Sequence, residues 1–371
     1  MCFIVRGLFS STSNPVILTN VVINYLCSLS PPIMSAMRSL FLALLAVSSS
    51  VAAEQPVVLR VGFFPNLTHA PALAARQLER EGKDFHQANL PAGVKLEWRS
   101  FNAGPSAMEA LVAGAIDVTY VGASPVINAH VRTKGRSIRV LAPVASGGNA
   151  LVVRKGSPLR TAADFRGRRV ATPQLGNTQD VDARIWLRSG GLNITIAGGD
   201  AQVLPAQNAE LIALFKRGDV DAAWTVEPWV TRLVDDFGGE VLVENRDSII
   251  TVLASSQKAL DGKGDAVKAF VRSHYLLRDR LSADPVLLER LSREALGAES
   301  RSAAPKAALI SPALRRIRWD LPEDPALRLR RLTEAFGKAQ ADSRACGLLA
   351  GEAPVAPLLQ ALVDDLPVVR K

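Results

Sequence analysis

Four segments of small and polar residues each follow a strand-like apolar run and precede a helix-like run. They span residues 63–69, 102–106, 122–125 and 174–179. The first turn of a helix has backbone N–H groups without intrahelical partners and carries the positive end of the helix dipole. Converging loops of this kind would form a neutral, donor-rich site for an anion. The alternative is that each loop only caps its own helix, but a fourfold recurrence favours anion binding.

The same loops lack the groups that catalysis or metal binding needs. Ser106 and Ser124 lie beside prolines in loop-to-helix turns, where capping is an ordinary role of serine. Neither has an adjacent histidine–carboxylate pair that would make it a nucleophile. The sequence also contains no His-x-x-x-His or Cys/His spacing. We therefore expect no catalytic residue, no metal ligand and no cofactor.

The positions of charged residues relative to the loops also bear on the ligand. No arginine or lysine lies within the four loops, which favours a singly charged oxyanion over a phosphate that needs a bidentate arginine. Asp180 and Asp182 follow Thr178 in the first turn of a helix, where they would stabilise its dipole and point away from an anion. We expect His130 and His274, which fall on helical patterns away from the loops, to lie at the surface.

The elements around the loops follow a β-α-β-α-β order in the first half of the chain. The strands are expected at 57–63, 94–101 and 115–121, and the helices at 70–81 and 106–113. This order predicts a parallel sheet with ligand sites at the carboxyl ends of its strands.

The second half repeats the order, and residues 111–118 are echoed by residues 214–222. The strands are expected at 169–172, 201–205 and 221–225, and the helices at 178–189 and 208–217. Strand-like runs at 138–153 and 247–253 are the expected crossovers. The sequence thus predicts an α/β protein with a first lobe at 54–147, a second lobe at 148–248, and a return of 249–371 to the first lobe with C-terminal helices.

The N-terminal region has the pattern of a secretory signal. Residues 34–53 contain one basic residue, a short apolar run, and then small residues that predict cleavage after Ala53. A retained membrane helix is the alternative, although the run is short for that role. Residues 1–33 lie upstream of this signal, so translation is expected to start at Met34 or Met37. The residues before Cys27 lack a lipoprotein processing site, so we expect a periplasmic protein without a lipid anchor.

Composition narrows the classes of partner. The chain has 371 residues, of which 48% are hydrophobic, and it is long for one domain. Aromatic residues make up 5%, which argues against a nucleic-acid stacking surface. The formal net charge of +9 would help to concentrate small anions. Cys346 is the only cysteine after the predicted cleavage point, so no internal disulfide is expected in the mature chain.

Five phrases resemble the periplasmic solute-binding proteins of ABC importers, in the NMT1-like branch that serves aliphatic sulfonates, taurine and nitrate. They are residues 64–70, 101–105, 113–117, 173–180 and 221–229, and the resemblance extends from Val57 to about Lys338. It implies the two-lobed type II periplasmic-binding-protein fold, with two mainly parallel sheets joined by two crossover strands.

The resemblance also implies a ligand site. Loop side chains and amides would hold the anion's oxygens, Trp229 would flank its carbon portion, and Glu227 would meet the ammonium group of a taurine-like zwitterion. The implied ligand-binding set is Asn66, Thr68, His69, Gly104, Ser106, Ala123, Ser124, Gly147, Gln174, Gly176, Asn177, Thr178, Glu227 and Trp229. For Ser106, Ser124, His69, Glu227 and Trp229, a local capping or packing role is the alternative.

The implied function is capture of a small organic oxyanion, an aliphatic sulfonate or taurine, by hinge closure. A monomeric binding protein would deliver this ligand to a membrane permease with its ATPase. Nitrate or a thiamin precursor is the alternative ligand. A pyrimidine-synthase-like enzyme on the same fold would need a pyridoxal-bearing lysine and a cysteine-rich stretch, neither of which is recognisable here. A sensory module that signals to a membrane receptor is not distinguished from a transporter by the sequence.

Overall fold

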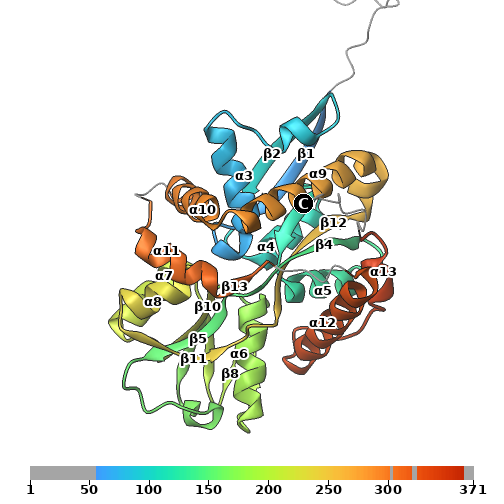
Figure 1. Ribbon diagram of the computed structural model, residues 1–371. Coiled ribbons are helices and arrows are strands. Elements are labelled where there is room, and N and C mark those ends of the chain that lie inside the picture. The colour runs from blue at the N-terminus through green and yellow to red at the C-terminus, as the bar shows by residue number, and fades with distance from the viewer. Residues whose placement is uncertain (1–55, 301–303, 320–323, 363–371) are drawn as a thin grey trace, which may run out of the picture. The chain divides into compact units, whose positions relative to one another are not determined.

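The computed structural model describes residues 56–300, 304–319 and 324–362 (Figure 1). The predicted signal sequence and its cleavage point after Ala53 lie outside these residues. Within the described part of the chain, no helix is long and apolar enough to cross a membrane.

The first sheet has six strands in the order β13-β4-β12-β3-β1-β2. Strand β1 pairs in parallel with β2 and β3, whereas β12 runs antiparallel to β3 and β4. The strands are β1 (Val57–Phe63), β2 (Val94–Ser100), β3 (Val118–Val121), β4 (Ile138–Gly147), β12 (Ile249–Ser256) and β13 (Ile317–Arg318).

Helices cover both faces of this sheet because successive strand residues point to opposite sides. Leu253 packs with α3, α9 and α10 on one face, and its neighbour Val252 packs with α4, α5, α12 and α13 on the other. The helices are α3 (Ala70–Arg80), α4 (Gly104–Val112), α5 (Ala123–Arg132), α9 (Gln257–Ala283), α10 (Pro285–Glu299), α11 (Ala307–Arg315), α12 (Pro325–Ala345) and α13 (Ala356–Leu359), with short 3-10 turns η2 (Leu67–His69) and η3 (Gln87–Asn89).

The second sheet has five strands in the order β11-β5-β10-β6-β9. Helix α6 packs on one face, and α7 and α8 pack on the other. Its elements are β5 (Asn149–Arg154), η4 (Ala162–Phe165), β6 (Arg169–Thr172), α6 (Thr178–Ser189), β9 (Gln202–Pro205), α7 (Asn208–Arg217), β10 (Ala222–Val226), α8 (Trp229–Asp235) and β11 (Gly239–Glu244), with the small pair β7 (Ile194–Thr195) and β8 (Gly198–Gly199).

Both sheets are mixed, which differs from the expectation of mainly parallel sheets. The parallel pairs are those of the predicted β-α-β units, β1 with β2 and β3, and β6 with β9 and β10. The crossover strands add antiparallel pairs, because β4 and β12 run back across the first sheet and β5 and β11 run back across the second.

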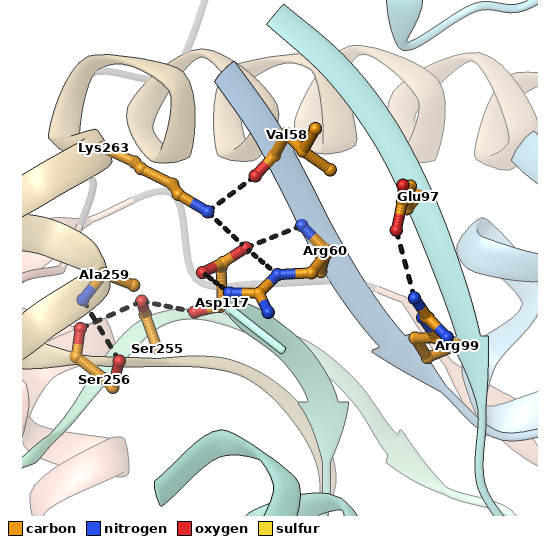
Figure 2. A network of polar contacts seen from close by, with 9 residues as sticks. All are labelled: Val58, Arg60, Glu97, Arg99, Asp117, Ser255, Ser256, Ala259 and Lys263. Atoms are coloured by element: carbon orange, nitrogen blue, oxygen red, sulfur yellow. Dashed lines mark hydrogen bonds and ion pairs between the residues drawn. The ribbon is translucent and has the colours of Figure 1, made fainter. Parts of the chain in front are cut away.

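An aspartate just before a strand accepts a hydrogen bond from a backbone N–H of the neighbouring strand in each half of the repeat. Figure 2 shows Asp117, whose carboxylate accepts hydrogen bonds from the Arg60 backbone N–H (2.8 Å) and Lys263 Nζ (2.9 Å). Burial opposes ionisation of Asp117, but these bonds and the Arg60 guanidinium leave its pKa below the usual value. Its counterpart Asp221 accepts from the Arg169 backbone N–H at 2.8 Å. The echoed phrase therefore anchors equivalent strands.

The chain passes between the sheets at two places. Strand β4 ends at Gly147 and β5 begins at Asn149, and Gly147 and Gly148 between them have φ of 74° and 67°. The return runs from β11, which ends at Glu244, to β12, which begins at Ile249. We use "first lobe" for 56–147 with 249–362 and "second lobe" for 148–248. These boundaries remain a proposal, which the sheet topology supports.

Candidate functional site

The predicted loops meet around a small cavity of about 30 Å³ between the two lobes. This volume has room for about two water molecules. The cavity lies beyond the carboxyl ends of the parallel strands, where ligands bind in open α/β sheets. Its described lining comprises Phe64, Asn66, Thr68, His69, Asn102, Ala103, Gly104, Gly122, Pro125, Pro173, Asn177, Thr178, Gln179, Asn208, Val226 and Ile250.

Four helices begin at this cavity. Helices α4, α5, α6 and α7 start at Gly104, Ala123, Thr178 and Asn208, which belong to the lining or directly follow it. The residues that precede α4, α5 and α7 make no side-chain cap. In α6 the preceding Asn177 accepts from the Asp180 N–H at 2.8 Å. First-turn N–H groups of the three uncapped helices can therefore serve an anion.

Thr178 supplies a side-chain donor that is not used within the structure. Thr178 is 6% exposed, and its Oγ1 has no hydrogen-bond partner among the described residues. A buried hydroxyl without a partner costs free energy, so a ligand oxygen at this position would recover a lost interaction.

Amide side chains line the second-lobe wall of the cavity. Asn177 Nδ2 donates to Gln179 Oε1 at 3.0 Å, which fixes the orientation of both groups. Asn208 Oδ1 accepts from Thr225 Oγ1 at 2.8 Å, so the Asn208 NH₂ group keeps its donors. This wall therefore presents oriented neutral donors.

His69 is a neutral member of the lining. It is 2% exposed, and burial lowers its pKa to about 3. Its Nδ1 accepts from the Phe64 backbone N–H at 3.3 Å, so the proton of the neutral ring is on Nε2. The local contact that the sequence offered as an alternative is thus present, and Nε2–H is still a donor.

The described lining contains no lysine, arginine, aspartate or glutamate. The nearby Asp180 is fully buried, and its carboxylate accepts from the Gly176 N–H at 2.9 Å and from Arg184 Nε at 3.0 Å. Its negative charge is therefore balanced inside the second lobe. A monoanion would meet neutral dipoles in the cavity, with no full countercharge.

The two lobes touch directly at the cavity. A Cβ atom added to Gly122 of the first lobe would lie 2.4 Å from Thr178 Oγ1 of the second. The Leu67 N–H donates to the Glu227 carbonyl at 2.9 Å, and Trp229 Nε1 donates to Asn66 Oδ1 at 2.9 Å. The close approach of Gly122 to Thr178 depends on the missing Cβ, and these three contacts hold the lobes together beside the cavity.

The resemblance places Glu227 and Trp229 around a ligand, and in the structure both side chains contact other protein groups. The Glu227 carboxylate is fully buried, accepts from the Thr231 N–H (3.1 Å) and Oγ1 (3.0 Å), and pairs with Arg316 Nε at 3.3 Å. Trp229 is half-buried and packs against the cores of both lobes. Neither residue is among the described lining of the cavity. The contacts of the packing alternative are thus present, and the ligand roles of both residues stay predictions.

Six other predicted residues are also outside the small cavity, and four of them, Ser106, Gly147, Gln174 and Gly176, line neither cavity. Ser106 Oγ donates to the Ala103 carbonyl at 2.9 Å, which is a local helix-start contact. The Gly147 N–H donates to the Ser248 carbonyl at 3.1 Å, so this amide serves the crossover. The Gly176 N–H is bonded to Asp180, as described above, and Gln174 is absent from the described lining. Predicted residues that do line the cavity are Asn66, Thr68, His69, Gly104, Asn177 and Thr178.

Two surface expectations are wrong. His130 and His274 are both fully buried. His130 Nε2 lies 2.9 Å from the Pro354 carbonyl, and His274 Nδ1 lies 2.9 Å from the Tyr120 hydroxyl. Their partners are 224 and 154 residues away in sequence, so the helical pattern alone could not reveal them.

Asn208 lines the cavity but lies outside the four predicted loops. The turn from β9 to α7 repeats the strand-to-helix order of the four predicted loops, and this order is the signal that would have identified it. Asn102 and Gln179 lie within the predicted loops but were not among the implied ligand residues.

A larger groove of about 960 Å³ adjoins the site. It lies between α6 and α12 and is closed by β4 and the β11–β12 connection, and we call it the α6–α12 groove. Ala123, Ser124 and Thr178 belong to its lining, so two more predicted residues border it. Among the described residues, no group of three or more His, Cys, Asp and Glu side chains is arranged to hold a metal ion.

Curated relatives are binding proteins. The taurine-binding periplasmic protein of Escherichia coli (strain K12) is 27% identical over 188 residues, which cover 49% of this chain and 56% of the relative. A second relative from the same strain is 30% identical over 207 residues, which cover 55% of this chain and 60% of the relative. The chain thus spans less than two thirds of the length of these relatives.

Solved structures share the fold. The alkanesulfonate-binding protein SsuA from Xanthomonas axonopodis pv. citri, bound to MOPS, matches with a TM-score of 0.62 and 23% identity, over 83% of this chain and 99% of that one. The periplasmic aliphatic sulphonate binding protein SsuA from Escherichia coli matches with a TM-score of 0.60 and 21% identity, over 82% and 97%. The fold is that of the periplasmic binding proteins. Residues 52–286 match the NMT1-like family, and the chain belongs to it.

Proposed function

We propose that this protein is the extracytoplasmic substrate-binding component of an ABC importer and that it captures an organosulfonate, with aliphatic sulfonates and taurine as the leading candidates. The observation that carries the proposal is the neutral, donor-rich cavity at which α4, α5, α6 and α7 begin. The names of the relatives support the same ligand class.

The chemistry of the cavity favours a sulfonate head group. A sulfonate carries one negative charge on three oxygens, which suits several neutral N–H and O–H donors from both lobes. A phosphate dianion would need a countercharge such as a bidentate arginine, and the described lining offers none.

Capture would proceed by hinge closure. Ligand contacts both walls only when the lobes are together, so its differential affinity for the closed state shifts the population. Gly147 and Gly148, both at positive φ, lie at one crossover and can absorb the backbone change. The closed form would then be presented to a membrane permease with its ATPase, and we propose a monomer that is exported by the predicted signal and cleaved after Ala53.

A ligand panel tests the proposal. We expect isothermal calorimetry on the purified protein to detect methanesulfonate and taurine, and to detect phosphate at least tenfold more weakly. A thermal-shift series with the same ligands provides an independent readout, because ligand binding to the native state raises the midpoint. Failure of every sulfonate to bind would rule out the proposed ligand class.

Nitrate is the second candidate, because a cavity of about 30 Å³ is small for a carbon-bearing anion. Nitrate is planar, singly charged and lacks a carbon portion. Tighter binding of nitrate than of methanesulfonate in the same panel would favour it. Binding without transport, tested by uptake with and without the cognate permease, would instead favour a sensory role, and turnover of any bound anion would favour an enzyme.

A further inference from the structure

The α6–α12 groove is large enough for an organic group. Its volume of about 960 Å³ lies in the range of small-molecule sites. One face of α6 lines it through Thr178, Asp182, Ile185 and Trp186, whose spacing of three to four residues places them on the same side of a helix. The facing surface of α12 contributes Leu332, Ala335 and Ala339 with the same spacing.

The groove lies directly beside the anion site. Thr178 lines both the small cavity and the groove, and Ser124 in the groove lies two residues after Gly122 in the cavity. The contact between Gly122 and Thr178 is the partition between the two spaces. The unpartnered, buried Thr178 hydroxyl lies at this partition. A group held by Thr178 therefore has the groove directly beside it.

The inner wall of the groove is aromatic. Trp186 is half-buried, and its ring contacts Phe165 (centroids 5.2 Å apart) and Trp224 (6.2 Å) edge to face. Trp224 is 1% exposed, and its Nε1 donates to Asn149 Oδ1 at 2.8 Å. These contacts fix the Trp186 ring, so it can offer a rigid apolar surface at low entropic cost.

The charges around the groove are balanced. Its described lining contains five lysine or arginine residues and five aspartate or glutamate residues. Arg246 pairs with Glu244 at 2.9 Å, and Arg318 pairs with Asp247 at 2.6 Å. Lys338 pairs with Asp342 one turn away on α12. Three of the five cationic side chains are therefore paired, and the acidic residues, Asp182 among them, equal the basic ones in number, so the groove has no net positive charge to favour a second anionic group.

We propose that the α6–α12 groove receives the carbon portion of an organosulfonate whose sulfonate binds at the helix N-termini, and that this portion is an aryl or alicyclic group without a second negative charge. This inference rests on the proposed function and extends it from small aliphatic sulfonates to bulky ones. Entry of the ligand requires Thr178 to separate from Gly122, which joins the two spaces. The carbon portion then packs on Trp186, and α12 covers its other side.

The test compares naphthalene-2-sulfonate with methanesulfonate by calorimetry on the full chain. The unmodified protein is expected to bind naphthalene-2-sulfonate at least tenfold more tightly than methanesulfonate. Trp186→Ala should weaken naphthalene-2-sulfonate about tenfold and methanesulfonate less than twofold. Naphthalene-1,5-disulfonate should bind at least tenfold more weakly than the monosulfonate, because its second charge meets the groove.

Two further variants test whether a change in affinity comes from the groove or from a general loss of folding. Ala335 is half-exposed and lines the groove on α12, so Ala335→Phe fills part of the groove. This variant should lose the preference for naphthalene-2-sulfonate and still bind methanesulfonate. Trp98→Ala, a half-buried tryptophan that packs against Phe63 at 5.6 Å in the first sheet, is the matched control and should leave the preference unchanged.

The outcomes separate the two proposals. If methanesulfonate binds and naphthalene-2-sulfonate does not, the groove proposal is wrong and the proposed function stands. Equal losses for both ligands in Trp186→Ala would also overturn it. So would a lower unfolding midpoint with unchanged affinities, because Trp186 would then contribute only to packing. If no sulfonate binds, the proposed function itself fails.

Discussion

At the scale of single residues, Thr178 has opposite expected effects on stability and binding. Replacing its unpartnered hydroxyl by a methyl group in Thr178→Val removes a buried, unsatisfied polar atom. The free energy of unfolding should therefore stay the same or rise slightly. A hydrogen bond to a charged ligand contributes about 1.5–3 kcal/mol, so affinity for methanesulfonate should fall about tenfold or more. Urea unfolding and calorimetry on the same variant measure the two effects.

Thr251→Val is the matched control for Thr178→Val. Thr251 Oγ1 is likewise buried without a partner among the described residues, but Thr251 is not in the described lining of either cavity. Its variant should show the same stability behaviour and unchanged affinity. A loss of affinity in both variants would show that Thr178 acts through general packing and has no contact with the ligand.

Single site residues can be predicted from the sequence where a local pattern, such as a strand followed by a helix start, marks their position. The loop at 174–179 is predicted by a local strand-to-helix pattern, the resemblance implies Asn177 and Thr178 within it, and both line the cavity. The resemblance implies ligand roles for Glu227 and Trp229, and the sequence does not reveal their protein partners: Arg316 lies in the C-terminal return, and Asn66 is 163 residues away from Trp229. Long-range partners of this kind follow from the tertiary fold and have no local signature.

At the scale of elements, the turn between β10 and α8 joins the second lobe to the C-terminal return. Glu227 in this turn pairs with Arg316, which also pairs with Glu244 of β11 at 3.0 Å. Burial raises the pKa of Glu227 to about 7 from 4.5, against the hydrogen bonds from Thr231 and the attraction of Arg316. The folded protein therefore binds this proton more tightly than the unfolded chain does.

The sign of the pH effect follows from this raised pKa. The stability that the proton contributes is complete below pH 4.5 and is lost as pH rises through about 7. The difference in unfolding free energy between the unmodified protein and Glu227→Gln should fall across this window, by an amount on the order of 3 kcal/mol. Urea unfolding at half-unit pH steps measures it. Taking the difference cancels the contributions of buried histidines such as His69, which change in the same pH range.

Asp247→Asn is the control for this pH experiment. Asp247 also pairs with an arginine, Arg318, but its side chain is 87% exposed, so solvent screens its charge. Its difference curve should be flat from pH 4.5 to 7.5. A flat curve for Glu227→Gln as well would show that Glu227 is ionised throughout and that Arg316 outweighs its burial.

Elements with a strong local pattern were predicted well, and those set by the crossovers were not. Helices α6 and α7 begin and end at the predicted residues, because Asn177 and Gly218 bound their apolar periodicity. Helix α4 begins at Gly104, two residues before the prediction, since Pro105 is compatible with a first helical turn. The antiparallel pairing of β4, β5, β11 and β12 depends on which sheet each strand joins, and alternation along a strand does not encode that choice.

At the scale of the whole molecule, closure depends on the absence of one side chain. Gly122 has φ of −76° and ψ of 160°, which an alanine adopts without strain. An added Cβ would lie 2.4 Å from Thr178 Oγ1 and 3.5 Å from the Ile250 carbonyl. Gly122→Ala should therefore leave each lobe folded and hold the lobes apart at the site. We expect about tenfold weaker methanesulfonate binding and an unfolding midpoint within a few degrees of the unmodified protein.

Small-angle X-ray scattering distinguishes this effect from a local clash with the ligand. If closure is blocked, the variant should have a larger radius of gyration than the unmodified protein at saturating methanesulfonate. Gly262→Ala is the control, because an added Cβ there has no heavy atom within 4 Å, and it should behave as the unmodified protein does. Equal radii for Gly122→Ala and the unmodified protein, together with weaker binding, would mean that the new methyl group obstructs the anion directly. Gly122 and Thr178 come from different lobes. A larger radius of gyration for Gly122→Ala would therefore show that the close approach of these two residues determines how far the lobes can close.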